Sequence, residues 1–193
     1  MPSLSRIQKY WLRRPGALTG GLRQLGRVEI RLIAEHAAGL SPGEAWLLGF
    51  PPRIPVWIRE IVMSIDDVNC IVARSLTPLK ASHGSWHSMR RLHTRPLADM
   101  LYRDSAITRS VFFSRRLNRH QAIYGTAKRA LGLSAPSAPA LLARCSVFRR
   151  ACEPLAVAEC FLPEFWLLAA KQAHKLAIFP DFRPNFQEHK GNS

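Results

Sequence analysis

The sequence has few cysteines and no long apolar run, and these shortages exclude several classes of protein. Four cysteines are spread over 193 residues, and no two of them form a CxxC pair or a knuckle with nearby histidines. A zinc site is therefore disfavoured. The longest apolar stretch near the C-terminus, residues 165–170, is far shorter than the roughly 20 residues that a membrane-spanning helix needs. We expect no membrane span.

The first residues, MPSLSRIQKYWLRRPG, also lack the apolar segment on which a secretory signal peptide depends. We therefore expect a cytoplasmic protein. In that reducing compartment the four thiols serve as small core residues rather than as disulfide partners.

Acidic residues are scarce as well, because 13 Asp and Glu stand against 28 Lys and Arg, which gives a net charge of +15. Such a surface favours anionic partners, but net charge does not separate a polynucleotide from a lipid headgroup or a small dicarboxylate. The 47% hydrophobic and 21% charged residues are ordinary for a globular protein and exclude a disordered chain.

The length predicts a single domain. We place it at residues 1–168, with a flexible insertion near residues 133–140, where Ala, Ser and Pro dominate. Residues 169–193 have no clear period and are predicted to be a partly disordered C-terminal tail.

Period-two stretches of β-branched and apolar residues predict most of the fold. Strands are expected at 27–35, 56–63, 68–77, 146–150 and 155–162, and helices at 5–13 and from Thr94 to about Arg103, while 40–55 is predicted to be a loop with at most one helical turn. The aspartates at 66 and 67 suit the turn of a hairpin. These elements predict an α+β fold with an antiparallel sheet of about six strands.

Charged residues interrupt two of these strands. Alternate residues share one face of a strand, so Arg59 shares a face with apolar residues, and Glu60 on the other face does so too. Glu159 in LAVAECFLP likewise lies among core residues. An unpaired buried charge costs several kcal/mol, so each such residue needs a partner or a ligand.

Two interpretations of these charges remain open. One is an internal salt bridge between arginine and glutamate. The other is a ligand pocket between sheet and helices, where the Arg59 guanidinium binds a substrate carboxylate and Glu159, at the far end, meets a hydroxyl or takes a proton.

At these residues the sequence resembles the chorismate pyruvate-lyase family, which makes 4-hydroxybenzoate at the start of bacterial ubiquinone synthesis. Five segments carry the resemblance in the family's order: GALTGGL at 16–22, VWIREIVM at 56–63, ARSLTPL at 73–79, TRPLADMLY at 94–102 and EPLAVAECFLPE at 153–164. Together they span most of the chain, and the resemblance implies a chorismate lyase-like fold.

The resemblance also implies the roles of individual residues. Arg59 is expected to bind the ring carboxylate, Glu159 to meet the 4-hydroxyl end and Leu97 to close over the ring. Leu18 stands where family members carry methionine and is expected to make a lid contact. Chorismate has a second carboxylate, and Arg74, on the strand next to Arg59, is our candidate to bind it.

The implied reaction is an elimination of pyruvate from chorismate that needs neither a metal nor an organic cofactor. Glu159 then acts either as a general base or by stabilising developing charge. We expect a monomer whose ligands are chorismate and 4-hydroxybenzoate. The Ala/Ser/Pro insertion, the tail and the basic surplus depart from a minimal family member.

Other functions compete with this one. A related fold serves as the effector-binding domain of transcription regulators, but no helix-turn-helix accompanies it here. Basic residues mixed with aromatics between 88 and 129 could bind RNA, although a solvated positive face explains them and we expect no nucleic-acid partner. His83 and His87 stand four apart without a third ligand, so they do not indicate a metal site.

Overall fold

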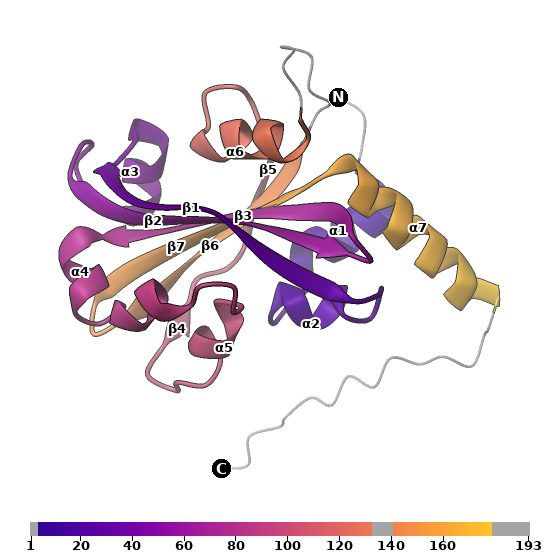
Figure 1. The fold of residues 1–193 in the computed structure, drawn as a ribbon, viewed down its shortest axis with the longest axis horizontal. Coiled ribbons are helices and arrows are strands. Elements are labelled where there is room, and N and C mark those ends of the chain that lie inside the picture. The colour runs from indigo at the N-terminus through magenta and orange to yellow at the C-terminus, as the bar shows by residue number, and fades with distance from the viewer. Residues whose placement is uncertain (1–3, 133–140, 179–193) are drawn as a thin grey trace.

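A computed structural model describes residues 4–132 and 141–178, and its framework is one antiparallel sheet (Figure 1). The strands are β1 (Val28–Gly39), β2 (Pro55–Ile65), β3 (Val68–Pro78), β4 (Thr108–Arg109), β5 (Phe113–Arg116), β6 (Leu142–Arg150) and β7 (Glu153–Phe161). Their order is β1-β2-β3-β7-β6-β4, and β5 also pairs with β6. This confirms the predicted α+β class, with seven strands where about six were expected.

Helices cover both faces of the sheet. They are α1 (Arg6–Arg13), α2 (Leu18–Leu22), α3 (Pro42–Leu48), α4 (Leu79–His83), the 3-10 helix η1 (His87–Arg91), α5 (Ala98–Leu101), α6 (Ala122–Ala130) and α7 (Pro163–Ile178). In Figure 1, α3 and α6 lie above the sheet and α2, α4 and α5 lie below it. No helix within the described ranges is long and apolar enough to cross a membrane.

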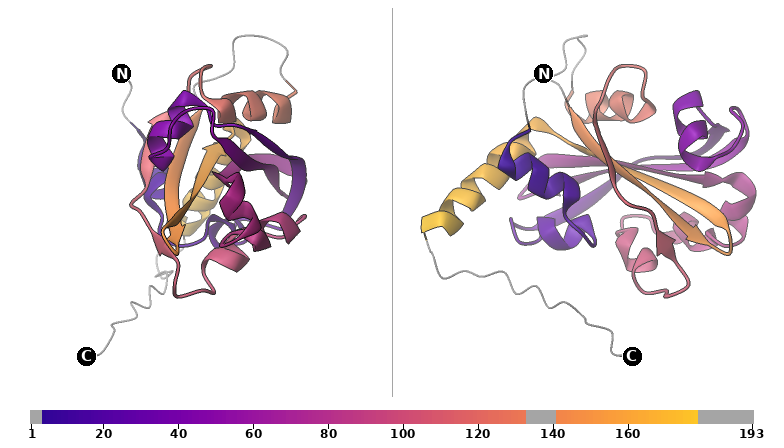
Figure 2. Two further views of the ribbon diagram at one scale, coloured as in Figure 1. Left: turned by 90° about the vertical axis from the view of Figure 1, so that its left-hand side faces the viewer. Right: turned by 180° about the vertical axis from the view of Figure 1, so that it is seen from behind.

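The face of the sheet that carries Arg59 and Glu159, here called the first face, holds two separate apolar clusters. One cluster joins α1, α2 and α7 to the ends of β2 and β3, with Phe161 and Phe165 at its centre. The other joins α4, η1 and α5 to β6 and β7, around Trp86 and Leu155. Seen from behind, α1 lies against α7, away from α5 (Figure 2).

The second face is divided in the same way. There α3 packs on Val56, Ile58 and Leu76, whereas α6 packs on Val62 and Val72. Each face therefore has two helical groups.

Two tight hairpins set the register of the central strands. Asp66 and Asp67 join β2 to β3 with φ of 47° and 66°, and Ala151 and Cys152 join β6 to β7 with φ of 49° and 65°. Two successive positive φ values are the signature of a type I′ turn. The predicted hairpin with aspartates in its turn is confirmed.

Some sequence predictions were wrong. Residues 42–48 form two turns of helix rather than one, because Ser41 caps the N-terminus and Pro42 occupies the first turn. Helix α7 continues to Ile178, beyond the predicted start of the tail. Cys152 is exposed, whereas Cys70 and Cys160 are buried as expected. The predicted insertion at 133–140 and the tail from 179 to 193 lie outside the described residues.

Candidate active site

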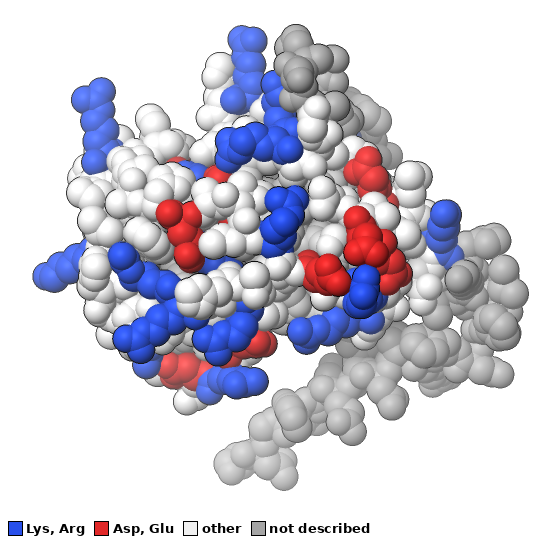
Figure 3. All heavy atoms as spheres, in the orientation of Figure 1, with Lys and Arg blue, Asp and Glu red and all other residues white. Residues whose placement is uncertain are grey.

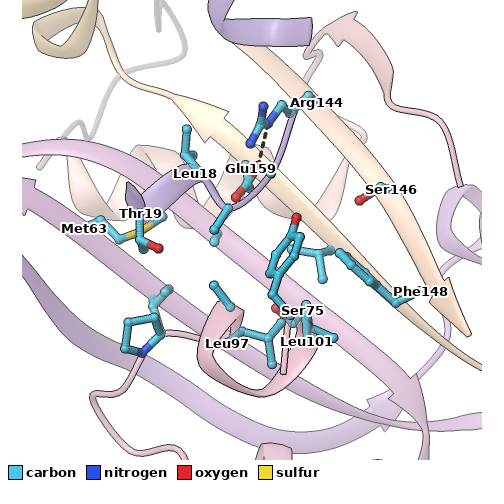
Figure 4. Close-up of a pocket in the computed structure, with 18 of the residues that line it drawn as sticks. Leu18, Thr19, Met63, Ser75, Leu97, Leu101, Arg144, Ser146, Phe148 and Glu159 are labelled. Atoms are coloured by element: carbon cyan, nitrogen blue, oxygen red, sulfur yellow. Dashed lines mark hydrogen bonds and ion pairs between the residues drawn. The ribbon is translucent and has the colours of Figure 1, made fainter. Parts of the chain in front are cut away.

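A cavity opens on the first face, between α2 on one side and the segment around α5 on the other. Its volume is about 560 Å³, part of it open to solvent. The lining residues come from the first face of the sheet, from α2, from α5 and from the segments that flank these helices; they include Leu18, Thr19, Arg59, Ile61, Ala73, Ser75, Leu97, Leu101, Tyr102, Phe112, Arg144, Ser146 and Glu159. The cavity thus occupies the gap between the two apolar clusters of this face (Figure 4).

Small side chains make room for the cavity. Arg59 pairs with Ser75 on β3, and Glu159 pairs with Ala73 on the same strand. Because β3 lies between β2 and β7, two strand spacings and an offset of two residues along the strands separate Arg59 from Glu159, which together is about 12 Å. Neither Ser75 nor Ala73 is long enough to fill the space between them.

Arg59 is almost completely buried, with 1% of the residue exposed. Its Nη2 donates hydrogen bonds to the carbonyl oxygens of His93, at 2.7 Å, and Arg95, at 3.1 Å. Its Nε lies 3.5 Å from Oε1 of Glu35, but neither atom has a hydrogen-bond partner in the described part of the chain. Burial lowers the pKa of Arg59, and Glu35 opposes that shift.

Glu35 lies beside Arg59 on the neighbouring strand, since the two residues pair across β1 and β2. Burial raises the pKa of this carboxyl above 4.5, and the positive charges of Arg59, His93 and Arg90 act against the shift. Desolvation therefore has a larger effect on this carboxyl than the neighbouring basic residues have.

Glu159 is held by a second arginine. Nε of Arg144 donates to Oε2 of Glu159 at 2.6 Å, and this ion pair is drawn in Figure 4. Arg144 in turn donates through Nη1 to the carbonyl oxygens of Trp11 and Arg14, and its guanidinium lies 4.2 Å from the ring centre of Phe112. The ion pair fixes the Glu159 carboxylate at the wall of the cavity.

Apolar side chains from two helical segments close the cavity on the side away from the sheet. Leu18 begins α2 and Leu97 precedes α5, and both are buried. Tyr102 lines the same cavity and accepts a hydrogen bond on its hydroxyl oxygen from Arg109 at 2.8 Å. Burial is the largest influence on the Tyr102 hydroxyl and raises its pKa.

The structure brings together four of the five predicted site residues. Arg59, Glu159, Leu18 and Leu97 line one cavity, and Arg59 and Glu159 each have another partner rather than pairing with one another. Arg74 does not lie with them.

Arg74 is on the second face of the sheet. It pairs in register with Glu60, one position after Arg59, and a shift of one residue in a strand moves a side chain to the other face. Its guanidinium binds Glu60 at 2.6 Å and Glu44 at 2.7 Å. Arg59 and Glu60, which are neighbours in β2, are therefore both buried, on opposite faces of the sheet.

Sequence reasoning missed Arg144, Glu35 and Tyr102. The predicted strand began at residue 146, after the Ala/Ser/Pro stretch, so Arg144 fell outside it although it pairs with Glu159 across β6 and β7. Extending that strand by period two would have placed Arg144 on the same face as Ser146. Glu35 stood at the end of a predicted strand, and no local pattern links it to Arg59.

The described residues show no metal centre, because within 4–132 and 141–178 no three His, Cys, Asp or Glu side chains gather in a group that could hold an ion.

Sequence comparison identifies relatives over nearly the whole chain. The profile of a family described as chorismate lyase matches residues 1–171. A protein of Bordetella pertussis named "Probable chorismate pyruvate-lyase" is 56% identical over 167 residues, which covers 86% of this chain and 87% of that protein. "Probable chorismate pyruvate-lyase 1" of Pseudomonas entomophila is 38% identical over 178 residues, covering 92% and 94%.

Solved structures share the fold at low identity. The effector domain of PhnF from Mycobacterium smegmatis superposes with a TM-score of 0.51 and 14% identity over 77% of this chain and 90% of that chain. A GntR-family transcriptional regulator from Bacillus cereus gives a TM-score of 0.51 and 15% identity over 71% and 92%. At this identity the likeness shows the fold alone.

Proposed function

The chain belongs to the chorismate lyase family, and from that membership we propose that it eliminates pyruvate from chorismate to give 4-hydroxybenzoate for ubiquinone biosynthesis. One observation carries the proposal. A buried guanidinium and a carboxylate line a single apolar cavity from two different strands, with small side chains between them. A flat ring with an acid at one end and a hydroxyl at the other fits this arrangement.

Arg59 binds the ring carboxylate in this proposal. Its Nη2 is already held by two backbone carbonyls, so the orientation of the guanidinium is fixed before substrate arrives. Because both hydrogens of Nη2 are used by these carbonyls, the proposed contact with the ring carboxylate is made by the other amino group of the guanidinium, Nη1, as a charge-assisted hydrogen bond.

Glu159 acts at the opposite end, where chorismate carries its 4-hydroxyl group. In the reaction the C3–O bond of the enolpyruvyl ether breaks and C4 loses its hydrogen as a proton. The ring becomes aromatic, and the released enolpyruvate takes up a proton to become pyruvate. Glu159 either accepts the C4 proton as a general base or stabilises charge as it develops, and Arg144 keeps its carboxylate in place for both roles.

Leu18 and Leu97 keep water away from the ring. Because aromatisation drives the elimination downhill, the protein needs to orient the substrate and exclude water more than it needs strong acids or bases. Two leucines from opposite sides of the cavity suit that requirement. The proposal uses no cofactor.

The test is a direct assay in which purified protein is incubated with chorismate and the absorbance of 4-hydroxybenzoate is followed. Glu159→Gln keeps the shape of the side chain and removes its charge, so we expect turnover to fall by roughly 100-fold or more. Glu29→Gln, a substitution of an exposed carboxylate in β1, is the matched control and should leave turnover unchanged. Full turnover by the Glu159 variant would disprove the catalytic role.

A non-catalytic effector-binding domain is the second candidate, favoured by the fold shared with regulators. It predicts binding of an aromatic acid without turnover. Nucleic-acid binding predicts retention that falls steeply with salt, but Figure 3 shows Lys and Arg side chains spread over several parts of one face rather than along a single groove. The cytoplasmic location and the monomeric state stay predictions.

A further inference from the structure

A second hollow lies on the opposite face of the sheet, between α3 and α6. Its volume of about 900 Å³, part of it open to solvent, exceeds that of the candidate active site. It fills the gap between the two apolar clusters of the second face. Arg74, the one predicted site residue that the active-site cavity does not contain, lies in its wall.

The hollow exists because its floor is made of small side chains. Ala143 and Cys145 on β6 stand beside Ala156 and Ala158 on β7, and all four line it. Burial raises the pKa of the Cys145 thiol to about 12, so this side chain contributes as a small apolar group rather than as a nucleophile.

Aromatic and aliphatic side chains form the walls. Trp46 on α3 and Phe113 on β5 line the hollow and are 73% and 45% exposed. Leu117 and Ile123 add apolar surface from the other side. Large aromatic side chains left open to water around a concavity are typical of binding sites, because covering them with a ligand is favourable.

Three arginines, Arg74, Arg115 and Arg144, are among the polar residues that line the hollow. Arg74 is buried, and although Nε and Nη1 bind Glu44 and Glu60 closely, Nη2 reaches only one oxygen of Glu44 at 3.5 Å. Arg115 and His120 are exposed residues that also line the hollow. Glu44 is the single acidic side chain in the lining, and it forms an ion pair with Arg74, which also pairs with Glu60.

We propose that this hollow binds an amphiphilic monoanion, a molecule with an apolar body larger than one benzene ring and a single acidic group. The apolar body lies on the alanine floor between Trp46 and Phe113, and the acidic group meets Arg115 and the free side of Arg74. The ligand is distinct from chorismate in charge and size. The proposal does not depend on the function assigned to the first face.

Anilinonaphthalene sulfonate is the first probe, because it combines two aromatic ring systems with one anionic group and its fluorescence rises in apolar surroundings. Its binding to the full chain is followed by fluorescence titration. Decanoate and naphthoate are then added as competitors, so that alkyl and aromatic bodies are distinguished. We expect saturable binding of one probe molecule and displacement by at least one of the two acids.

Substitutions in and near the hollow test where the probe binds. Ala158→Leu fills the floor, and we expect it to weaken probe binding by at least about tenfold, which corresponds to 1.4 kcal/mol. Arg115→Gln should weaken binding by up to about fivefold, the range for one exposed charge pair. Arg31→Gln, which removes an exposed charge from the same face outside the hollow, is the matched control and should change nothing.

Several results would overturn the proposal. Unchanged binding in Ala158→Leu and in Ala122→Trp, a second variant that blocks the hollow from α6, would exclude this site. Loss of binding in Arg59→Lys would place the probe in the active-site cavity instead. A molar mass that doubles with concentration and falls in Trp46→Ser would show that a second copy of the chain covers the hollow. Circular dichroism and urea unfolding of the same variants check their folding separately.

Discussion

At the scale of single residues, Arg59 and Glu159 in the active-site cavity each have a residue of opposite charge beside them. Glu35 lies 3.5 Å from Arg59, and Arg144 lies 2.6 Å from Glu159. The two contacts differ in strength. Arg144 makes several close contacts, whereas the facing atoms of Glu35 and Arg59 make no hydrogen bond within the described residues.

The loose contact between Glu35 and Arg59 predicts a measurable dependence on pH. Because burial raises the pKa of Glu35 in the folded state, the native protein holds this proton more tightly than the unfolded chain does. The stabilising contribution is complete below the unfolded pKa, near 4.5, and is lost as pH rises through the folded pKa. We therefore expect the stability of the wild type relative to Glu35→Gln to fall as pH rises above 4.5.

Urea unfolding of both proteins at a series of pH values measures this difference. Glu29→Gln, an exposed carboxylate on the same strand, is the control and should show no such trend. A stability difference that grows with pH would contradict the assigned direction of the shift.

Arg59 itself decides the binding of aromatic acids in the proposed function. Arg59→Ala removes the guanidinium that lines that end of the cavity, and we expect the affinity for 4-hydroxybenzoate to fall by roughly 30-fold or more, from about 2 kcal/mol for a lost buried charge contact. Calorimetry measures the affinity, with Arg31→Ala as the control. Because Arg59→Ala also leaves Glu35 without its cation, Arg59→Lys is measured beside it, since lysine keeps the charge but not the planar guanidinium that the His93 and Arg95 carbonyls hold. Unchanged affinity in both variants would remove Arg59 from the binding site.

At the scale of elements, local sequence rules predicted the central hairpin. They failed for residue types that occur both in loops and at the ends of helices. Ser41, Pro42 and Gly49 resemble loop residues, yet they are the N-cap, the first turn and the left-handed C-cap of α3. Strand β5 is exposed at every residue and so has no apolar alternation to detect. The face of Arg74 was beyond local reasoning, because it depends on the register of β3 against β2.

The β6–β7 turn offers a test at this scale. Ala151 and Cys152 both adopt positive φ, which costs about 1 kcal/mol or more for residues with an ordinary side chain. The pair Asn-Gly suits a type I′ turn much better. We expect the double substitution Ala151→Asn and Cys152→Gly to stabilise the protein by about 1 kcal/mol, measured by urea unfolding. As a control, the reverse-order pair, Gly at 151 and Asn at 152, should stabilise less, and equal stability of all three proteins would show that the turn is unstrained.

At the scale of the whole molecule, the site depends on strand order more than on any sequence neighbourhood. Arg59 and Glu159 are far apart along the chain. They line the same cavity because β7 lies next to β3 in the sheet rather than at the edge of the sheet. Period-two patterning predicted that both charges would be buried. Patterning could not predict the order β1-β2-β3-β7-β6, so it left a shared pocket as one of two interpretations, and the resemblance to a family favoured the pocket.

Net charge is the property of the whole molecule that bears most directly on its proposed substrate. Chorismate carries two carboxylates, and a protein with a net charge of +15 attracts a dianion by a long-range electrostatic interaction. Dissolved salt weakens this attraction. We expect kcat/KM for chorismate to fall several-fold between about 20 mM and about 300 mM sodium chloride, because the screening length shortens over that range. The value of kcat should stay nearly constant, since the buried charges in the cavity are shielded from bulk ions. Steady-state assays measure both parameters, with a neutral osmolyte at matched osmolality as the control. A salt effect confined to kcat would place the dependence in the cavity rather than in the field of the basic surface.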